Sequence, residues 1–294
     1  MKKNKDFFGS FPLRFFEIAR KKQFQKTQYV GLSVPIFFLV LLKKKTKKKD
    51  FHCNLPAGRQ VPNSKPNFNQ KQKPMLKIGH RGAKGYVAEN TLASFQKAID
   101  LGCHGIELDV QTCKTGEIVV HHDTTIDRTT NGSGAIKDLN LIELQHYNIP
   151  TLEQVLDLVQ NYFLVNIELK SNDCVEKVIK IVSLYITEKN WTLENFVLSS
   201  FDWTNLEAVY AFHPKIKTAV LTEKSVEKAI EFASTINAFA INPHYKLLTA
   251  KNVALCKQEG FKIYTWTVNE FSDIEKMKLL NVHGIISDFP DKIS

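Results

Sequence analysis

The chain has 294 residues, of which 43% are hydrophobic and 24% are charged, as in an ordinary globular protein with one large domain or two small ones. Its net charge of +10 is unevenly distributed. Residues 1–74 carry 18 Lys/Arg and 3 Asp/Glu, whereas residues 75–294 carry 22 Lys/Arg and 27 Asp/Glu. The acidic balance of residues 75–294, together with the absence of a base-reading motif, argues against a nucleic-acid partner. The five cysteines are widely spaced without a C-x-x-C pair. They predict neither a disulfide framework nor a zinc site and favour a reducing compartment.

The first 74 residues differ in kind from the rest. Lysine runs at 43–45 and 47–49 and an Asn/Gln/Pro-rich stretch at 63–74 predict a basic, disordered extension, because such a composition buries too little apolar surface. The apolar segment 29–42 has 14 residues, fewer than the roughly 20 of a membrane-spanning helix.

Three interpretations of this extension remain open. Residues 29–49 could anchor the protein on a membrane through lysine contacts with anionic lipid, or form an atypical signal segment. The third interpretation places residues 1–74 outside the working protein, because Met75 directly precedes the first expected strand. We favour the third, with a domain at 75–294 in the cytoplasm, and keep membrane association as the alternative.

From residue 76 onward, short apolar runs alternate with segments of helical periodicity. Expected strands lie at 76–80, 105–110, 118–122, 164–169, 196–200, 217–221, 238–242, 262–268 and 284–287. Expected helices lie at 90–101, 150–162, 173–189, 203–212, 225–235, 250–258 and 271–280, with an irregular segment at 124–149. This alternation predicts an α/β fold of parallel strands joined by helical crossovers, and a (β/α)₈ TIM barrel suits the length.

Nine expected strands are one too many for eight barrel positions. The link between residues 110 and 118 is too short for a helical crossover, so one run should be a hairpin arm or a closing piece outside the barrel. A doubly wound open sheet is the alternative fold. It is less favoured because no Gly-rich phosphate loop follows the first strand.

Three acidic residues lie on two of the expected strands. Glu107 and Asp109 are two apart on one strand and therefore project to the same face, and Glu168 lies on another. Buried like charges are costly unless they are paired or bound to metal. All-oxygen ligands favour Mg²⁺ or Ca²⁺ over zinc, so these residues predict a site for one divalent cation.

Two histidines and two cationic residues lie at strand ends, where barrel active sites are found. His80 and His122 could supply one general base and one general acid for phosphodiester cleavage. The neighbouring His121 must face the opposite way to His122. Arg81 and Lys170 could bind phosphate oxygens or pair with the carboxylates.

Trp266 follows a further expected strand. It could form a wall of the pocket against the alcohol part of a substrate or lie in the core.

Together these blocks resemble the glycerophosphodiester phosphodiesterase family. The longer matching blocks are HRGAKGYVAENT at 80–91, GIELDV at 105–110, HDTTIDRTTNG at 122–132 and NIELK at 166–170. Shorter ones follow in order at 149–152, 198–202, 266–269 and 284–291. One departure is Ala88, where the family usually has proline, and it removes no chemical group.

The resemblance implies a barrel enzyme that hydrolyses glycerophosphodiesters to glycerol 3-phosphate and an alcohol with one divalent cation. Carried onto this chain, it makes Glu107, Asp109 and Glu168 the metal ligands, and His80 and His122 the acid–base pair. Arg81 and Lys170 become phosphate contacts. The alternatives are a lysophospholipase D-type enzyme using the same residues and, less favoured, a non-catalytic phosphodiester-binding barrel.

We expect residues 75–294 to fold and to hydrolyse substrate without the extension. A disordered segment contributes few packed contacts, so its removal should leave the melting temperature nearly unchanged. The test compares the full chain with residues 75–294 alone on a soluble diester. An inactive shorter chain beside an active full chain would place the extension inside the enzyme. Under the anchor interpretation, only the full chain sediments with anionic vesicles, and salt weakens that binding.

Overall fold

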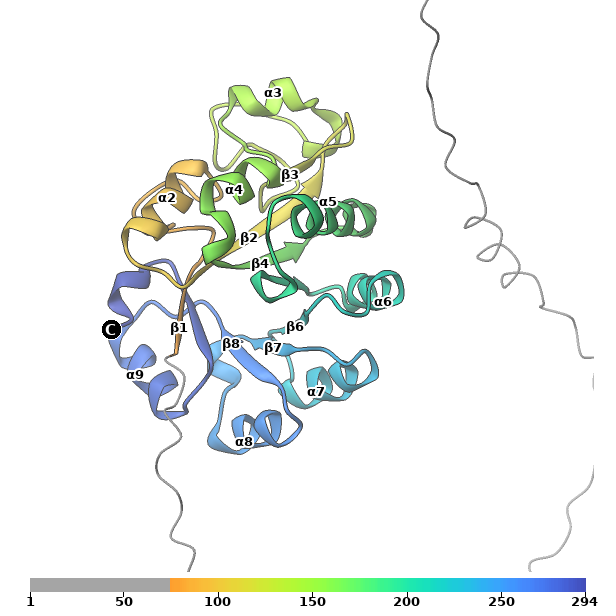
Figure 1. The fold of residues 1–294 in the computed structure, drawn as a ribbon. Helices are drawn as coiled ribbons and strands as arrows, with labels where there is room; N and C mark the ends of the chain where they lie inside the picture. The colour runs from red at the N-terminus through yellow and green to blue at the C-terminus, as the bar shows by residue number, and fades with distance from the viewer. Residues whose placement is uncertain (1–74) are drawn as a thin grey trace, which may run out of the picture. The chain divides into compact units, whose positions relative to one another are not determined.

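The structure, a computed structural model, describes residues 75–294, so the predictions for residues 1–74 and their segment 29–42 lie outside the described residues. Within residues 75–294, eight parallel strands form a closed barrel with helices around it (Figure 1). The strands are β1 (Leu76–Gly79), β2 (Gly105–Thr112), β4 (Leu164–Leu169), β5 (Phe196–Ser200), β6 (Thr218–Thr222), β7 (Ala240–Pro243), β8 (Lys262–Thr265) and β9 (Gly284–Ser287). β1 pairs with both β2 and β9, which closes the barrel and confirms the predicted fold class.

Helices join successive barrel strands. They are α2 (Leu92–Asp100), α4 (Leu152–Val159), α5 (Val175–Glu188), α6 (Trp203–Phe212), α7 (Val226–Thr235), α8 (Ala250–Gln258) and α9 (Phe271–Leu279). Short 3₁₀ turns lie at Ile136–Asp138, Gln160–Tyr162, Asn172–Cys174, Leu193–Asn195, Tyr245–Leu247 and Pro290–Lys292. None of the helices described in residues 75–294 is long and apolar enough to cross a membrane. The cytoplasmic location stays a prediction.

The surplus strand is β3 (Ile118–Val120), a hairpin arm outside the barrel. It runs antiparallel to the end of β2, with Val110 opposite Val120 and Thr112 opposite Ile118. β2 is eight residues long, so it extends past its parallel partners and offers an edge for this pairing. The hairpin carries the chain to His121 and His122 beside the barrel mouth.

The segment predicted to be irregular at 124–149 contains a helix, α3 (Leu141–His146), so that prediction was wrong. A capping box starts the helix: the Glu143 backbone N–H donates to Asn140 Oδ1, and the Glu143 carboxylate accepts from the Asn140 N–H. Such reciprocal bonds satisfy donors that would otherwise have no partner. Leu144 is buried in a small apolar cluster beneath the segment.

The barrel interior is apolar over part of its cross-section and polar over the rest. Six apolar side chains from six different strands pack together inside it: Ile78, Val197, Ala219, Ala240, Tyr264 and Ile286. β2 turns Glu107 and Asp109 to the inside instead. Polar groups are therefore concentrated near β2 and β4, and the surrounding apolar residues exclude water from them.

Candidate active site

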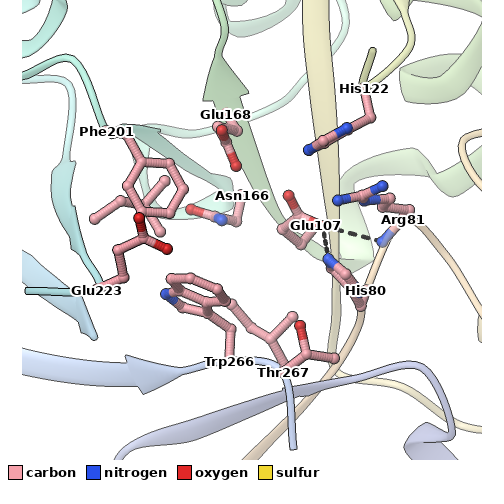
Figure 2. A pocket seen from close by; sticks show the side chains of 12 residues that line it. His80, Arg81, Glu107, His122, Asn166, Glu168, Phe201, Glu223, Trp266 and Thr267 are labelled. Atoms are coloured by element: carbon pink, nitrogen blue, oxygen red, sulfur yellow. Dashed lines mark hydrogen bonds and ion pairs between the residues drawn. The ribbon is translucent and has the colours of Figure 1, made fainter. Parts of the chain in front are cut away.

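A cavity of about 240 Å³ lies at the carboxyl ends of the strands. Six of the eight predicted site residues line it: His80, Arg81, Glu107, His122, Glu168 and Trp266 (Figure 2). The remaining two, Asp109 and Lys170, contact that set. Asp109 Oδ2 lies 3.3 Å from Arg81 Nε, and Lys170 Nζ lies 2.7 Å from Glu168 Oε1. Lys170 Nζ also lies 3.6 Å from Asp109 Oδ1. The structure thus brings together residues that lie up to 186 positions apart in the chain.

Strand register places the three carboxylates next to one another. In the parallel pairing of β2 with β4, Glu107 lies beside Asn166 and Asp109 beside Glu168. Residues paired in register point to the same side of a sheet, so all four side chains face the barrel interior. The oxygens of Glu107, Asp109 and Glu168 lie within 4.8 Å of one another, and all three residues are buried.

The charges in this cluster do not balance when all three carboxylates are ionised. Two cationic side chains face them, Lys170 and Arg81, whose Nε lies 3.3 Å from Asp109 Oδ2. Burial, followed by the charge of Asp109, raises the pKa of Glu168 to about 7, and burial with the neighbouring carboxylates raises the pKa of Glu107. Burial alone would raise the Asp109 pKa, but Arg81 and Lys170 keep it low.

These residues fit a hard divalent cation. Asp109 Oδ1 is buried and has no hydrogen-bond partner within residues 75–294. Carboxylate oxygens are the ligands that Mg²⁺ and Ca²⁺ prefer, and the two positive charges of such a cation would favour the ionised forms of Glu107 and Glu168.

The loop after β1 adopts a strained backbone that directs the Arg81 N–H at the carboxylate cluster. Arg81 has φ of 49°, which is uncommon for a residue with a side chain. Its carbonyl accepts from the Asn90 N–H and from Ser94 Oγ, which fixes this conformation. The Arg81 N–H then donates to Glu107 Oε2 at 3.0 Å. Gly82 has φ of +86°, and a Cβ there would lie 2.4 Å from Ser94 Oγ, so the loop requires glycine at this position.

Each of the two pocket histidines has a carboxylate against its Nδ1. His80 Nδ1 lies 2.6 Å from Asp288 Oδ1, and His122 Nδ1 lies 2.6 Å from Asp123 Oδ1. A carboxylate can only accept, so Nδ1 carries the hydrogen and the free lone pair of each ring is on Nε2. Burial lowers the pKa of His80 although its bond to Asp288 opposes this. His121 is buried, and its Nε2 contacts the Thr125 carbonyl oxygen at 3.0 Å, away from the pocket.

An ion-pair chain links the second histidine to the first loop. Asp123 Oδ2 accepts from Arg128 Nε at 2.6 Å, and Arg128 Nη2 donates to Glu89 Oε1 at 2.6 Å. Glu89 also accepts from Arg81 Nη1 at 2.7 Å. The hairpin segment with His122 is therefore attached to the same loop that positions Arg81.

Several residues of this arrangement were not in the predicted site. Asp123 and Asp288 orient the histidines, Asn90 donates to Asp109 Oδ2 at 2.9 Å, and Phe201 and Glu223 line the far end of the pocket. A usable signal was present for four of them. Asp123 is adjacent to His122, and Asp288 directly follows the last expected strand. Asn90 and Phe201 lie in the matching blocks at 80–91 and 198–202.

A TIM barrel with two carboxylate-oriented histidines, two cationic side chains and a carboxylate cluster at its mouth carries the groups needed to cleave a phosphate ester. The model of the glycerophosphoryl diester phosphodiesterase family matches residues 80–292. The chain therefore belongs to this family, and the protein is an enzyme, a phosphoric diester hydrolase.

Three known proteins illustrate the similarity. A glycerophosphodiester phosphodiesterase of Caldanaerobacter subterraneus subsp. tengcongensis is 38% identical over 74% of this chain and 96% of its own length. An Oleispira antarctica phosphodiesterase, solved with the product sn-glycerol-3-phosphate, is 28% identical and has a TM-score of 0.66 over 74% of this chain and 94% of its own. A human lysophospholipase D is more distant, at 25% identity over 74% of this chain and 84% of its own length.

We expect the stability of the protein to decrease as the pH rises, and we expect a divalent cation to prevent this decrease. The folded-state pKa of Glu168, about 7, exceeds its ordinary value of 4.5. This group's stabilising contribution is therefore complete below about pH 4.5 and is lost as the pH rises through about 7. In EDTA, the melting temperature of the wild type should decrease more between pH 6 and pH 8 than that of Glu168→Gln. Adding Mg²⁺ or Ca²⁺ should restore the wild-type melting temperature at pH 8.

The Glu168→Gln comparison is needed because the partly buried histidines His80 and His283 have lowered pKa values and give the opposite trend. The melting temperatures of wild type and Glu168→Gln could instead change with pH in the same way and be unaffected by either cation. That result would contradict repulsion within the carboxylate cluster.

Proposed function

We propose that the protein hydrolyses glycerophosphodiesters to glycerol 3-phosphate and an alcohol, with Mg²⁺ or Ca²⁺ on Glu107, Asp109 and Glu168. The observation that carries the proposal is the pair of carboxylate-oriented histidines in the pocket that holds the carboxylate cluster. The activity named for the Caldanaerobacter relative and the product in the Oleispira structure support the same substrate class.

In this mechanism, His80 and His122 move protons at Nε2. One accepts the proton of the attacking hydroxyl, and the other donates a proton to the oxygen of the leaving alcohol. Asp288 and Asp123 orient the rings and stabilise the protonated form of each histidine, as in other His–carboxylate pairs. Because the glycerol 2-hydroxyl belongs to the substrate itself, it is a suitably placed nucleophile; a cyclic phosphate then forms and water opens it.

Arg81 and Lys170 neutralise the phosphate oxygens. Both are bonded to carboxylates, Arg81 to Glu89 and Lys170 to Glu168, and these bonds fix the directions of the cationic groups. A divalent cation bound by the carboxylates would supply Lewis acidity toward the phosphate and the hydroxyl. The apolar barrel interior below excludes water and strengthens each of these charge interactions.

A lysophospholipase D-type activity is the second candidate. The observation that favours it is an adjoining cavity of about 550 Å³ whose lining includes Phe201, Trp203 and Leu221. The same cavity also contains Glu223, Lys224 and Lys228, which suit a polar group better than an acyl chain. We therefore favour small deacylated diesters as substrates.

We expect purified protein to release glycerol 3-phosphate from glycerophosphodiesters in the presence of Mg²⁺ or Ca²⁺. Release is measured with and without each cation and in excess EDTA, beside a lysophospholipid of matching headgroup. Full activity in EDTA would contradict the metal requirement. Faster headgroup release from the lysophospholipid would favour the second candidate.

His80→Ala and His122→Ala should each lower kcat by roughly 10²–10⁴-fold, which is the usual contribution of acid–base catalysis. His121→Ala should lower kcat much less, since that ring bonds to the Thr125 carbonyl oxygen outside the pocket. Melting temperatures measured beside kcat separate loss of folding from loss of chemistry. If folded His121→Ala were as inactive as His122→Ala, the assignment of His122 would be wrong.

A further inference from the structure

The pocket has a second end that the proposed mechanism does not use. Figure 2 shows the Glu223 carboxylate between the Phe201 and Trp266 rings, across the pocket from His80, Arg81 and His122. We propose that these three residues form a subsite for a positively charged alcohol, so that choline and ethanolamine diesters are the preferred substrates. This inference rests on the proposed function, since it assigns the alcohol group of the same reaction.

The two aromatic side chains form an apolar corner. The rings of Phe201 and Trp266 meet edge to face, with centroids 5.4 Å apart and planes at 89°. The Trp266 ring is fixed, because its Nε1–H donates to the Asn242 carbonyl oxygen at 2.8 Å and its edge packs against His244. Two ring surfaces at a right angle can contact a quaternary ammonium group from two sides, and tryptophan is the best side chain for such cation–π contact.

Glu223 adds a negative charge at this corner. It directly follows β6, just as Phe201 follows β5 and Trp266 follows β8, so all three come from the catalytic end of the barrel. Within residues 75–294, no Lys, Arg or His forms an ion pair with the Glu223 carboxylate. It differs in this respect from Glu89 and Glu168, each of which has a cationic partner. Glu223 is an exposed residue of the pocket lining, so its charge is available to a bound ammonium group.

The position of the subsite agrees with the route of the substrate. The phosphate lies between Arg81, Lys170 and the two histidines in the proposed mechanism, and the glycerol hydroxyl lies toward the carboxylate cluster. The leaving alcohol then extends to the opposite side, where Phe201, Glu223 and Trp266 line the pocket. Choline places its charge two carbons beyond the ester oxygen, so a counter-charge is required close to the phosphate site.

The test measures kcat/KM of wild type and Glu223→Gln on two diesters of equal shape. One is glycerophosphocholine, and the other carries 3,3-dimethylbutanol, in which carbon replaces the charged nitrogen. Wild type should prefer the choline diester by about tenfold, and Glu223→Gln should reduce this preference to about threefold or less while changing the uncharged diester by less than about twofold. Glu207→Gln is the matched control, since Glu207 is exposed on α6 outside the pocket.

Three outcomes would overturn the subsite. An equal loss on both diesters in Glu223→Gln would assign the carboxylate to the glycerol group. An absence of charge preference in wild type would remove the ammonium site. Fastest hydrolysis of a diester whose alcohol carries a second phosphate would assign specificity to Lys224 and Lys228 of the adjoining cavity.

A binding measurement separates this inference from the proposed function. If wild type hydrolyses none of these diesters, the function fails, and choline itself is titrated while the Trp266 indole N–H signal is observed by NMR. Choline should shift that signal in wild type more than in Glu223→Gln, and 3,3-dimethylbutanol should shift it little in either. Equal effects of the two alcohols on wild type would overturn the subsite independently of catalysis.

Discussion

The mutual repulsion of three buried carboxylates is the constraint around which the mouth of this barrel is arranged. The β2–β4 register places Asp109 beside Glu168 and turns Glu107 to the same interior face. Desolvated like charges are costly, so the neighbouring segments supply cations and donors. Lys170 contacts Glu168 and Asp109, Arg81 contacts Asp109, and the Asn90 amide donates to the same carboxylate.

These partners in turn determine the shape of the loop between β1 and α2. Arg81 and Asn90 both have positive φ, of 49° and 57°, and both direct a polar group at the carboxylate cluster. The loop contacts α2 so closely that Gly82 has no room for a side chain. Backbone strain of this kind persists only where surrounding bonds stabilise it, and here those bonds lead to the site.

Much of the fold followed from the sequence, and so did the proximity of the predicted site residues, because both depend on local periodicity. Carboxylates two apart on a strand must share a face, and the residue after a parallel strand must lie at the barrel mouth. Contacts between distant segments could not be predicted from local periodicity. Asp288 contacts His80 only because β9 pairs with β1. α3 was missed because a helix of six residues is too short for its apolar pattern to be recognised, although a capping box marks its start. Glu223 lies in none of the matching blocks, and only the closed barrel makes Phe201 and Glu223 neighbours of Trp266.

The two histidines differ in how firmly their carboxylate partners are enclosed. The side chains of His80 and Asp288 are 12% and 17% exposed. On the other side of the pocket, Asp123 is held by an ion pair with Arg128, whose side chain is 50% exposed. Ion pairs at an exposed guanidinium weaken as dissolved salt increases, and enclosed pairs respond much less. Ionic strength should therefore act unevenly on the two pocket histidines: it loosens the orientation of His122 through Asp123 and Arg128 and leaves that of His80 nearly unchanged.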